Sequence, residues 1–96
     1  MRIRHKPWAK PELEACPFYV HEPQQQIGHW RELFEHPERP LYVELGCGKG
    51  GFISQAAPAH RDVNFVAMDI KNEMLVLAKR KLEAAYAELD ETPDNV

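Results

Sequence analysis

The residues best placed to do chemistry lie in a glycine-rich segment, YVELGCGKGGF, at residues 42–52. It holds four of the five glycines of the chain, directly behind a short apolar run. A backbone without side chains after a strand lets a ligand approach the main chain closely. One carboxylate, Glu44, precedes the glycines, and a second, Asp69, follows the next apolar run. The segment therefore predicts a cofactor site, and the spacing must decide which cofactor it fits.

Two phosphate-binding patterns can be tested against this segment. A Walker A loop requires GxxxxGK followed by Ser or Thr, but Lys49 is followed by glycine and position 43 is not glycine. That pattern is excluded. A dinucleotide loop requires GxGxxG after a strand, with an acid about 20 residues further on for the ribose. Asp69 lies at that distance, and three glycines fit the spacing: Gly46, Gly48 and Gly51.

A third pattern, acid-x-GxGxG, is formed by Glu44, Gly46, Gly48 and Gly50. S-adenosylmethionine has no pyrophosphate, yet its methionine part also needs a bare turn beneath it. A carboxylate in a buried strand is costly unless a cation or hydrogen bonds compensate it, and an ammonium-bearing ligand would do so. The alternative for Glu44 is an acid that orders the glycine turn, and for Asp69 a turn or helix-cap acid. Asp69 suits either cofactor, because both carry ribose hydroxyls from which a carboxylate can accept hydrogen bonds.

The composition, with 44% hydrophobic and 28% charged residues, is typical of a globular protein. No apolar run reaches the roughly 18 residues of a membrane span, and no apolar stretch follows the basic N-terminus as in a secretory signal, so we expect a cytoplasmic chain without a membrane partner. Cys16 and Cys47 have no partners at metal-ligand spacing, which predicts neither zinc nor a disulfide framework. Residues 1–10 carry a charge of +4 against −7 for the rest, so a basic arm precedes an acidic body.

The predicted architecture is α/β. Residues 1–40, with six of the eight prolines, form a lead-in with the basic arm and one amphipathic helix over residues 24–36. Residues 41–96 predict β-α-β-α: strands at 41–45 and 63–68, the second covered on both faces, and a long helix capped by Asn72. We expect the solvated face of that helix to carry Lys79, Arg80 and Lys81. This order is the opening of a doubly wound sheet, so we expect the N-terminal part of a longer protein.

Three segments together, MRIRHKPWA, YVELGCGKGGF and NFVAMDIKNEML, resemble the bacterial tRNA (guanine-N7-)-methyltransferase family, of the class I S-adenosylmethionine-dependent, Rossmann-like fold. The resemblance implies methyl transfer from S-adenosyl-L-methionine to N7 of a guanosine in the variable region of tRNA. It implies no catalytic base here, and it assigns the cofactor to five residues: Glu44, Gly46, Gly48, Gly50 and Asp69. The family usually has glutamate at the position of Asp69 and glycine at that of Ala67. Its substrate residues would lie beyond Val96, so we expect the 96-residue piece alone to be inactive.

Three basic residues of the arm, Arg2, Arg4 and Lys6, are the candidates for tRNA contact, because phosphate neutralisation dominates such affinity. Trp8 is expected either to anchor packing or to stack on a base, with packing favoured. Two other functions stay open. One is the first half of a NAD(P)- or FAD-dependent oxidoreductase, and the other is a non-catalytic module that binds RNA or a partner. The sequence also leaves a homodimer open.

Overall fold

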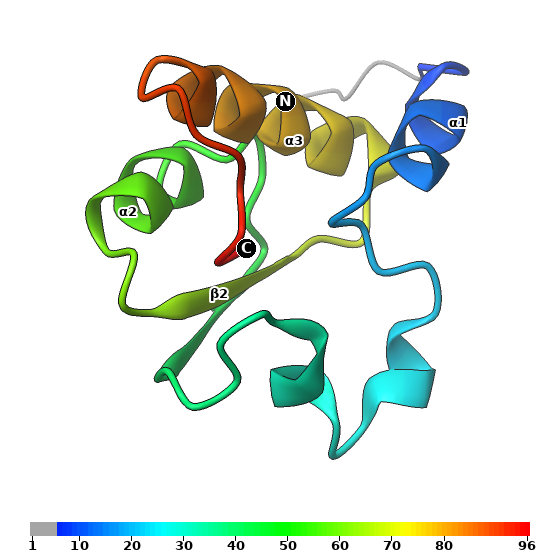
Figure 1. Cartoon of the computed structure of the whole chain (residues 1–96). Helices are drawn as coiled ribbons and strands as arrows, with labels where there is room; N and C mark the ends of the chain where they lie inside the picture. The colour runs from blue at the N-terminus through cyan, green and yellow to red at the C-terminus, as the bar shows by residue number, and fades with distance from the viewer. Residues whose placement is uncertain (1–5) are drawn as a thin grey trace.

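A two-stranded parallel sheet lies at the centre of the fold (Figure 1). In the computed structural model, which describes residues 6–96, β1 (Leu41–Leu45) pairs with β2 (Asn64–Met68), in a register that places Glu44 opposite Ala67. The helix α2 (Ile53–Ala59) connects the strands, and α3 (Asn72–Ala87) follows β2. The predicted α/β class and β-α-β-α order are confirmed, whereas the doubly wound order of a larger sheet stays a prediction.

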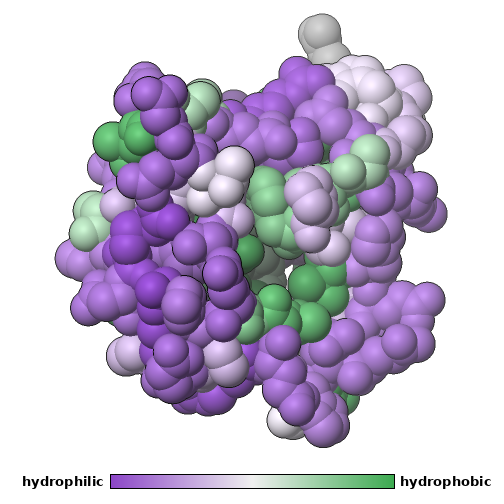
Figure 2. Space-filling model, viewed as in Figure 1, coloured by the Kyte–Doolittle hydropathy of each residue, from purple (hydrophilic) through white to green (hydrophobic). Residues whose placement is uncertain are grey.

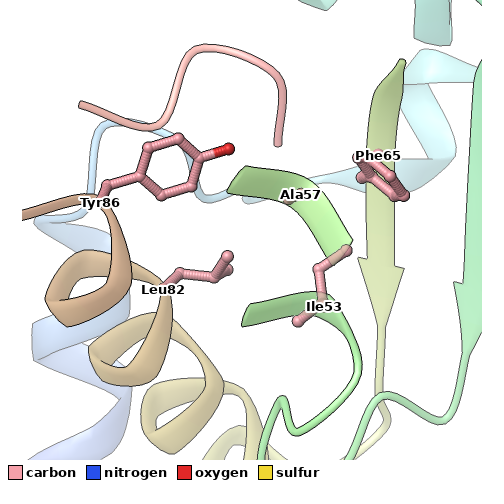
Figure 3. Packing of buried hydrophobic residues seen from close by; sticks show 5 residues of the cluster. All are labelled: Ile53, Ala57, Phe65, Leu82 and Tyr86. Atoms are coloured by element: carbon pink, nitrogen blue, oxygen red, sulfur yellow. The ribbon is translucent and has the colours of Figure 1, made fainter. Parts of the chain in front are cut away.

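The hydrophobic core lies between the strands and the two helices (Figure 3). One buried cluster contains Phe65 of β2, Ile53 and Ala57 of α2, and Leu82 and Tyr86 of α3, and each is at most 3% exposed. The apolar stripe of α3 predicts this contact, because residues three and four apart share a helix face. α3 begins at Asn72, with Lys71 at the cap position and no capping side chain. The predicted Asn72 cap is therefore wrong, and Asn72 is the first helical residue.

The opposite face of the sheet is open at β1 and partly covered at β2. Val43 is 45% exposed and Leu45 77% exposed, and their side chains share a strand face because side chains alternate along a strand. Val66 and Met68 of β2 face the same way and are only partly buried. The prediction that this second strand is covered on both faces is confirmed in part, because on this face Asn64 is buried while Val66 and Met68 are partly buried.

The predicted helix over residues 24–36 is also wrong. Two short 3₁₀ turns stand there instead, η1 (Pro23–Gln26) and η2 (Trp30–Leu33). Gly28 between them has a φ of +81°, which an α-helix cannot contain, and Ile27 is 75% exposed. The apolar spacing in this segment therefore does not correspond to a buried helix face.

The lead-in does contain one α-helix, α1 (Ala9–Glu14), which the sequence pattern did not predict. It docks on α3, where Ala9 and Leu13 pack against Val76. Glu12 accepts hydrogen bonds from Arg80 Nε at 2.8 Å and Nη2 at 2.5 Å, in the bidentate geometry of strong Arg–carboxylate pairs. Lys79 Nζ lies 3.3 Å from the same carboxylate, and its side chain is only 13% exposed. Lys79 therefore departs from the expected solvated helix face.

Trp8 takes part in the same contact. The Arg80 guanidinium lies over its ring, 4.3 Å from the ring centroid, as in a cation–π pair. One face of the indole is thereby occupied, while Trp8 is 40% exposed, so the favoured packing role stays a prediction.

An open cavity of about 1010 Å³ separates the lead-in from β2 and α3. Figure 2 shows it as a hollow near the middle of the molecule with apolar residues on its walls. Its lining includes Phe18, Trp30, Val66 and Met68, and it reaches Asp69 at the end of β2.

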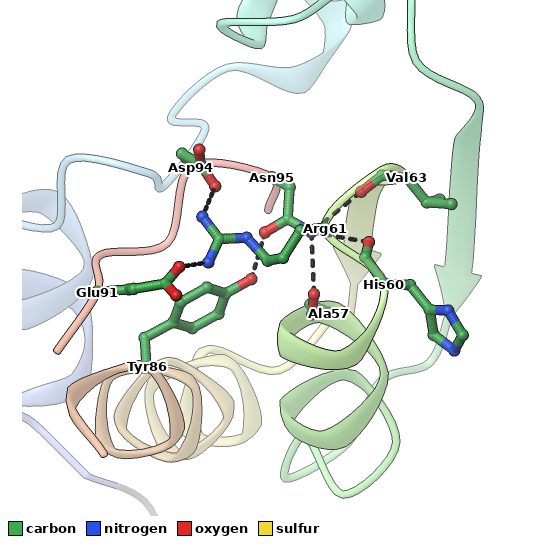
Figure 4. Close-up of polar contacts among 8 residues, drawn as sticks. All are labelled: Ala57, His60, Arg61, Val63, Tyr86, Glu91, Asp94 and Asn95. Atoms are coloured by element: carbon green, nitrogen blue, oxygen red, sulfur yellow. Dashed lines mark hydrogen bonds and ion pairs between the residues drawn. The ribbon is translucent and has the colours of Figure 1, made fainter. Parts of the chain in front are cut away.

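The last residues of the chain are held by one buried amide side chain, Asn95 (Figure 4). Its Nδ2 shares two hydrogens among three carbonyls, those of Ala57 at 3.0 Å, His60 at 3.3 Å and Val63 at 3.0 Å. Its Oδ1 accepts from the hydroxyl of Tyr86. Burial of that hydroxyl raises the pKa of Tyr86 to about 12. The backbone carbonyl of Asn95 accepts from the amide of β2 residue Phe65 at 2.7 Å, so this segment lies along the free edge of β2.

Arg61 adds further contacts to Tyr86 and to the segment that contains Asn95. Its guanidinium lies over the Tyr86 ring, 5.0 Å from the centroid, and forms ion pairs with Glu91 and Asp94 (Figure 4). The connection between α2 and β2 and the end of the chain thus form one polar cluster.

Within residues 6–96, no helix is long and apolar enough to cross a membrane. Over the same residues, no group of three or more His, Cys, Asp or Glu side chains gathers where a metal ion could bind. Cys16 and Cys47 are both free and buried.

Candidate cofactor site at the glycine loop

The glycine loop is tied to the end of β2 by its backbone. The Cys47 amide donates to the Met68 carbonyl at 2.9 Å, which extends the strand pairing beyond β1. The Gly48 amide donates to Asp69 Oδ2 at 3.0 Å, and the Lys71 amide donates to Asp69 Oδ1 at 2.9 Å. Each oxygen of Asp69 therefore accepts one amide and keeps a lone pair for a further donor. Two free acceptor positions on one carboxylate match the two hydroxyls of a ribose.

The backbone angles show which glycines the loop requires. Three of them have positive φ, +71° at Gly46, +56° at Gly48 and +83° at Gly50, whereas Gly51 does not. A Cβ built on Gly50 would lie 2.7 Å from the Ala78 Cα, while a Cβ on Gly51 would meet nothing within 4 Å. In a dinucleotide loop the third glycine serves close packing of helix on strand. Here that demand falls on Gly50, so the geometry follows the GxGxG spacing.

The space above the first two glycines is open. A Cβ built on Gly46 or Gly48 meets no atom within 4 Å. These two positions therefore offer bare backbone next to free volume, as a ligand lying against the main chain requires.

Glu44 brings an uncompensated carboxylate to this loop. Its Oε1 is buried and has no hydrogen-bond partner among the residues that the structure describes. Burial raises the pKa of Glu44, because removal from water disfavours the charged form. Since side chains alternate along β1, Glu44 faces the helix side of the sheet, as does its register partner Ala67. The site therefore lacks a donor or a cation at this oxygen.

Cys47, inside the loop, is a weak nucleophile at neutral pH. Burial, together with the negative charges of Asp69 and Glu44, raises the pKa of this thiol to about 11. Only the thiolate is strongly nucleophilic. The loop thus offers binding groups rather than a reactive side chain.

The residues predicted from the sequence are not all brought together. Glu44, Asp69 and the glycines meet at the carboxyl ends of the two strands, whereas Lys6 lies half-buried just before α1, its carbonyl accepting the Ala9 amide at 3.0 Å. Arg2 and Arg4, the other two candidates for tRNA contact, lie outside the described residues.

Two features of this site escaped sequence reasoning. Ile70, next to Asp69, is 95% exposed, so an apolar side chain lies open beside the carboxylate. The contact of Gly50 with Ala78 is the second. Its only trace in the sequence is the small size of Ala78 within the apolar stripe of α3.

Comparisons with known proteins relate the chain to methyltransferases. Residues 38–95 match a protein-family model described as "Putative methyltransferase". A tRNA (guanine-N(7)-)-methyltransferase of Clostridium perfringens (strain SM101 / Type A) is 52% identical over 96 residues, which is 100% of the chain and 44% of that relative. The enzyme of the same name from Ruminiclostridium cellulolyticum is 56% identical over 88 residues, covering 92% of the chain and 37% of the relative.

A third relative of that name, from Acetivibrio thermocellus, is 50% identical over 96 residues and is covered over 44% of its length. The chain thus spans less than half the length of the curated relatives it matches. The resemblance predicted from YVELGCGKGGF and its neighbouring segments is confirmed, and the chain belongs to the methyltransferase family that the matching model describes.

Proposed function

We propose that the chain forms the S-adenosylmethionine-binding part of a cytoplasmic enzyme that methylates N7 of a guanosine in tRNA. The names of its relatives suggest the substrate and the position. The observation that carries the proposal is the buried, unpartnered Oε1 of Glu44 beside the glycine turn. An anionic pyrophosphate would be repelled by this carboxylate, whereas an ammonium or sulfonium would stabilise its charged form.

The residues of the loop fit such a cofactor. Asp69 would accept hydrogen bonds from the ribose hydroxyls with the lone pairs that its two amide bonds leave free. Glu44 would hold the cationic methionine end. Gly46 and Gly48 would let that end lie against the main chain, because no atom fills the space where a Cβ would stand.

In this reaction these residues position the cofactor and transfer no proton. S-adenosylmethionine, when bound, supplies an electrophilic methyl group on a sulfonium. Guanine N7 carries an in-plane lone pair and no proton near neutral pH, so no general base is needed. Holding reactants in line converts a bimolecular step into an intramolecular one, worth up to about 7 to 11 kcal/mol in ideal cases. Glu44, Asp69 and the glycine turn contribute by fixing the methyl donor.

The tRNA would be attracted by the basic arm. We propose that three basic residues neutralise phosphates: Arg2, Arg4 and Lys6. Such binding weakens as the salt concentration rises. Trp8 is assigned to packing, because Arg80 covers one face of its ring.

Calorimetry on the chain tests the cofactor. We expect S-adenosylhomocysteine to bind and NADH not to bind. Asp69→Asn and Glu44→Gln should each weaken S-adenosylhomocysteine binding about tenfold or more, the loss of roughly one charge-assisted hydrogen bond. Asp62→Asn, which removes an exposed acid near the start of β2, is the matched control and should bind normally. Preferential binding of NADH would overturn the proposal in favour of an oxidoreductase.

Transfer itself is testable in a chimera. The chain would replace the matching segment of the Clostridium perfringens relative, to which it aligns over 96 residues. We expect radiolabelled methyl transfer to a tRNA transcript, and none to a transcript in which 7-deazaguanosine replaces guanosine, because that base lacks N7. A chimera that binds tRNA and S-adenosylhomocysteine without transfer would favour a binding module.

A further inference from the structure

The contact between the glycine loop and α3 assigns a role to a residue outside the loop. Ala78 is 3% exposed, and a Cβ on Gly50 would lie 2.7 Å from its Cα, 2.8 Å from its Cβ and 3.4 Å from its carbonyl oxygen. The loop backbone therefore rests directly on this turn of the helix. We infer that Ala78 is a positioning residue that fixes the distance between the glycine loop and α3.

Hydrogen bonds connect Gly50 to the rest of the loop and to α2. The Gly50 amide donates to the Cys47 carbonyl at 3.0 Å, and the Gly50 carbonyl accepts from the Ser54 amide in the first turn of α2 at 3.0 Å. Cys47 in turn is bonded to the Met68 carbonyl of β2. A shift at Gly50 therefore moves both the cofactor turn and the start of α2.

The same turn of α3 is braced from the other side by α1. At 100° per residue, Val76 and Arg80 lie on the helix face opposite Ala78. Val76 packs against Ala9 and Leu13, and Arg80 holds Glu12 with two hydrogen bonds. Figure 1 shows α1 beside the N-terminal half of α3. α3 is thus fixed between the lead-in helix and the glycine loop, which makes it a rigid support for the turn.

This role concerns the ligand-free loop, so its test does not depend on the proposed cofactor. The experiment compares amide hydrogen exchange of Gly50 and Ser54 in the chain without ligand. Ala78→Gly removes the Cβ at the contact, and Ala84→Gly makes the same change at an exposed position of α3. Both lose about 1 kcal/mol of helix propensity, but only the first leaves a gap under the loop.

We expect Ala78→Gly to speed exchange at Gly50 and Ser54 about tenfold relative to Ala84→Gly, because local opening of the loop becomes easier. Ala78→Ser keeps the Cβ and should restore protection. Equal exchange at Gly50 in the two glycine variants would overturn the inference. Loss of protection in Ala78→Gly that occurs equally in Ala78→Ser would also overturn the inference.

Ala78→Val tests the contact from the opposite direction. The added methyl groups push against Gly50, so exchange at Gly50 should rise more than at Phe65 in the core. Ala57→Val, which overpacks the core between α2 and β2 away from Gly50, is the control. If Ala78→Val does not fold, the two glycine variants decide the question. S-adenosylhomocysteine affinity should fall in Ala78→Gly and not in Ala84→Gly, and absence of binding in the unchanged chain would count against the proposed function alone.

Discussion

The Gly48 amide donates to the carboxylate of Asp69 across the ends of the two strands, at 3.0 Å. This bond joins the turn that would hold the methyl donor to the acid that would hold its ribose. Asp69 also accepts the Lys71 amide, so one side chain organises the loop and the entry to α3. The acid therefore has a structural task before any ligand arrives.

Asp69→Asn is accordingly expected to weaken both stability and cofactor binding. An asparagine amide offers one acceptor oxygen, so one of the two backbone amides loses its partner, at a cost of about 1 to 3 kcal/mol. Urea denaturation measures the first effect and calorimetry with S-adenosylhomocysteine the second. Asp62→Asn should change neither. Loss of binding with unchanged stability would show that the amide bonds contribute nothing.

Gly50→Ala should destabilise the protein far more than Gly51→Ala. At Gly50 the new Cβ meets the left-handed backbone penalty of about 1 to 2 kcal/mol, and overpacking against Ala78 adds about 1 to 3 kcal/mol. At Gly51 the backbone is ordinary and the space is open, so the change should stay within about 0.5 kcal/mol. Denaturant midpoints of the two variants give the comparison. Similar midpoints would contradict the assignment of the third loop glycine to position 50.

Tyr86→Phe should cost about 1 to 3 kcal/mol, because it leaves Oδ1 of the buried Asn95 without the hydroxyl it accepts from. The aromatic packing against the core is kept, so the loss isolates the hydrogen bond. Tyr42→Phe removes a hydroxyl from a ring that is 46% exposed and serves as control. Equal unfolding free energies for the two variants would show that the hydroxyl of Tyr86 is not needed.

The docking of α1 should depend on pH. The hydrogen bonds from Arg80, with the one from Lys79, lower the pKa of Glu12 from its ordinary 4.5 to about 2. A lowered pKa in the folded state means that the contribution to stability is complete above pH 4.5 and disappears as the pH falls towards 2. Glu12→Gln should therefore lower Tm at pH 6, and the difference from the unchanged protein should shrink between pH 4.5 and 2. A difference that does not vary with pH would refute the ion-pair explanation.

Local patterns predicted the parts of the fold that local residues determine. The apolar runs of β1 and β2 and the stripe of α3 lie in continuous segments, and each forms the expected element. The spacing of Ile27 and Trp30 suggested a helix, but Gly28 between them has a positive φ, which interrupts a helix. α1 has only 6 residues and is stabilised by Glu12 reaching residues 67 and 68 positions away. No local pattern contains that information.

The site shows the same division. Glu44, Asp69 and the glycines could be selected because strand ends converge at one edge of a parallel sheet. The missing partner of Glu44 and the contact of Gly50 with Ala78 depend on packing between segments far apart in the chain. The choice between GxGxG and GxGxxG could therefore not be made from spacing, since both patterns share their first two glycines.

The amide of Asn95 also limits how this part of the chain can vary. It contacts the carbonyls of Ala57, His60 and Val63 at once; Ala57 lies in the last turn of α2, and His60 and Val63 are the first and last residues of the connection from α2 to β2. An inserted or deleted residue in this connection would displace at least one of them from a side chain that cannot follow, because Asn95 is fully buried. The Asn95 amide thus restricts the length of this connection, and we expect insertions in related chains to occur elsewhere on the surface.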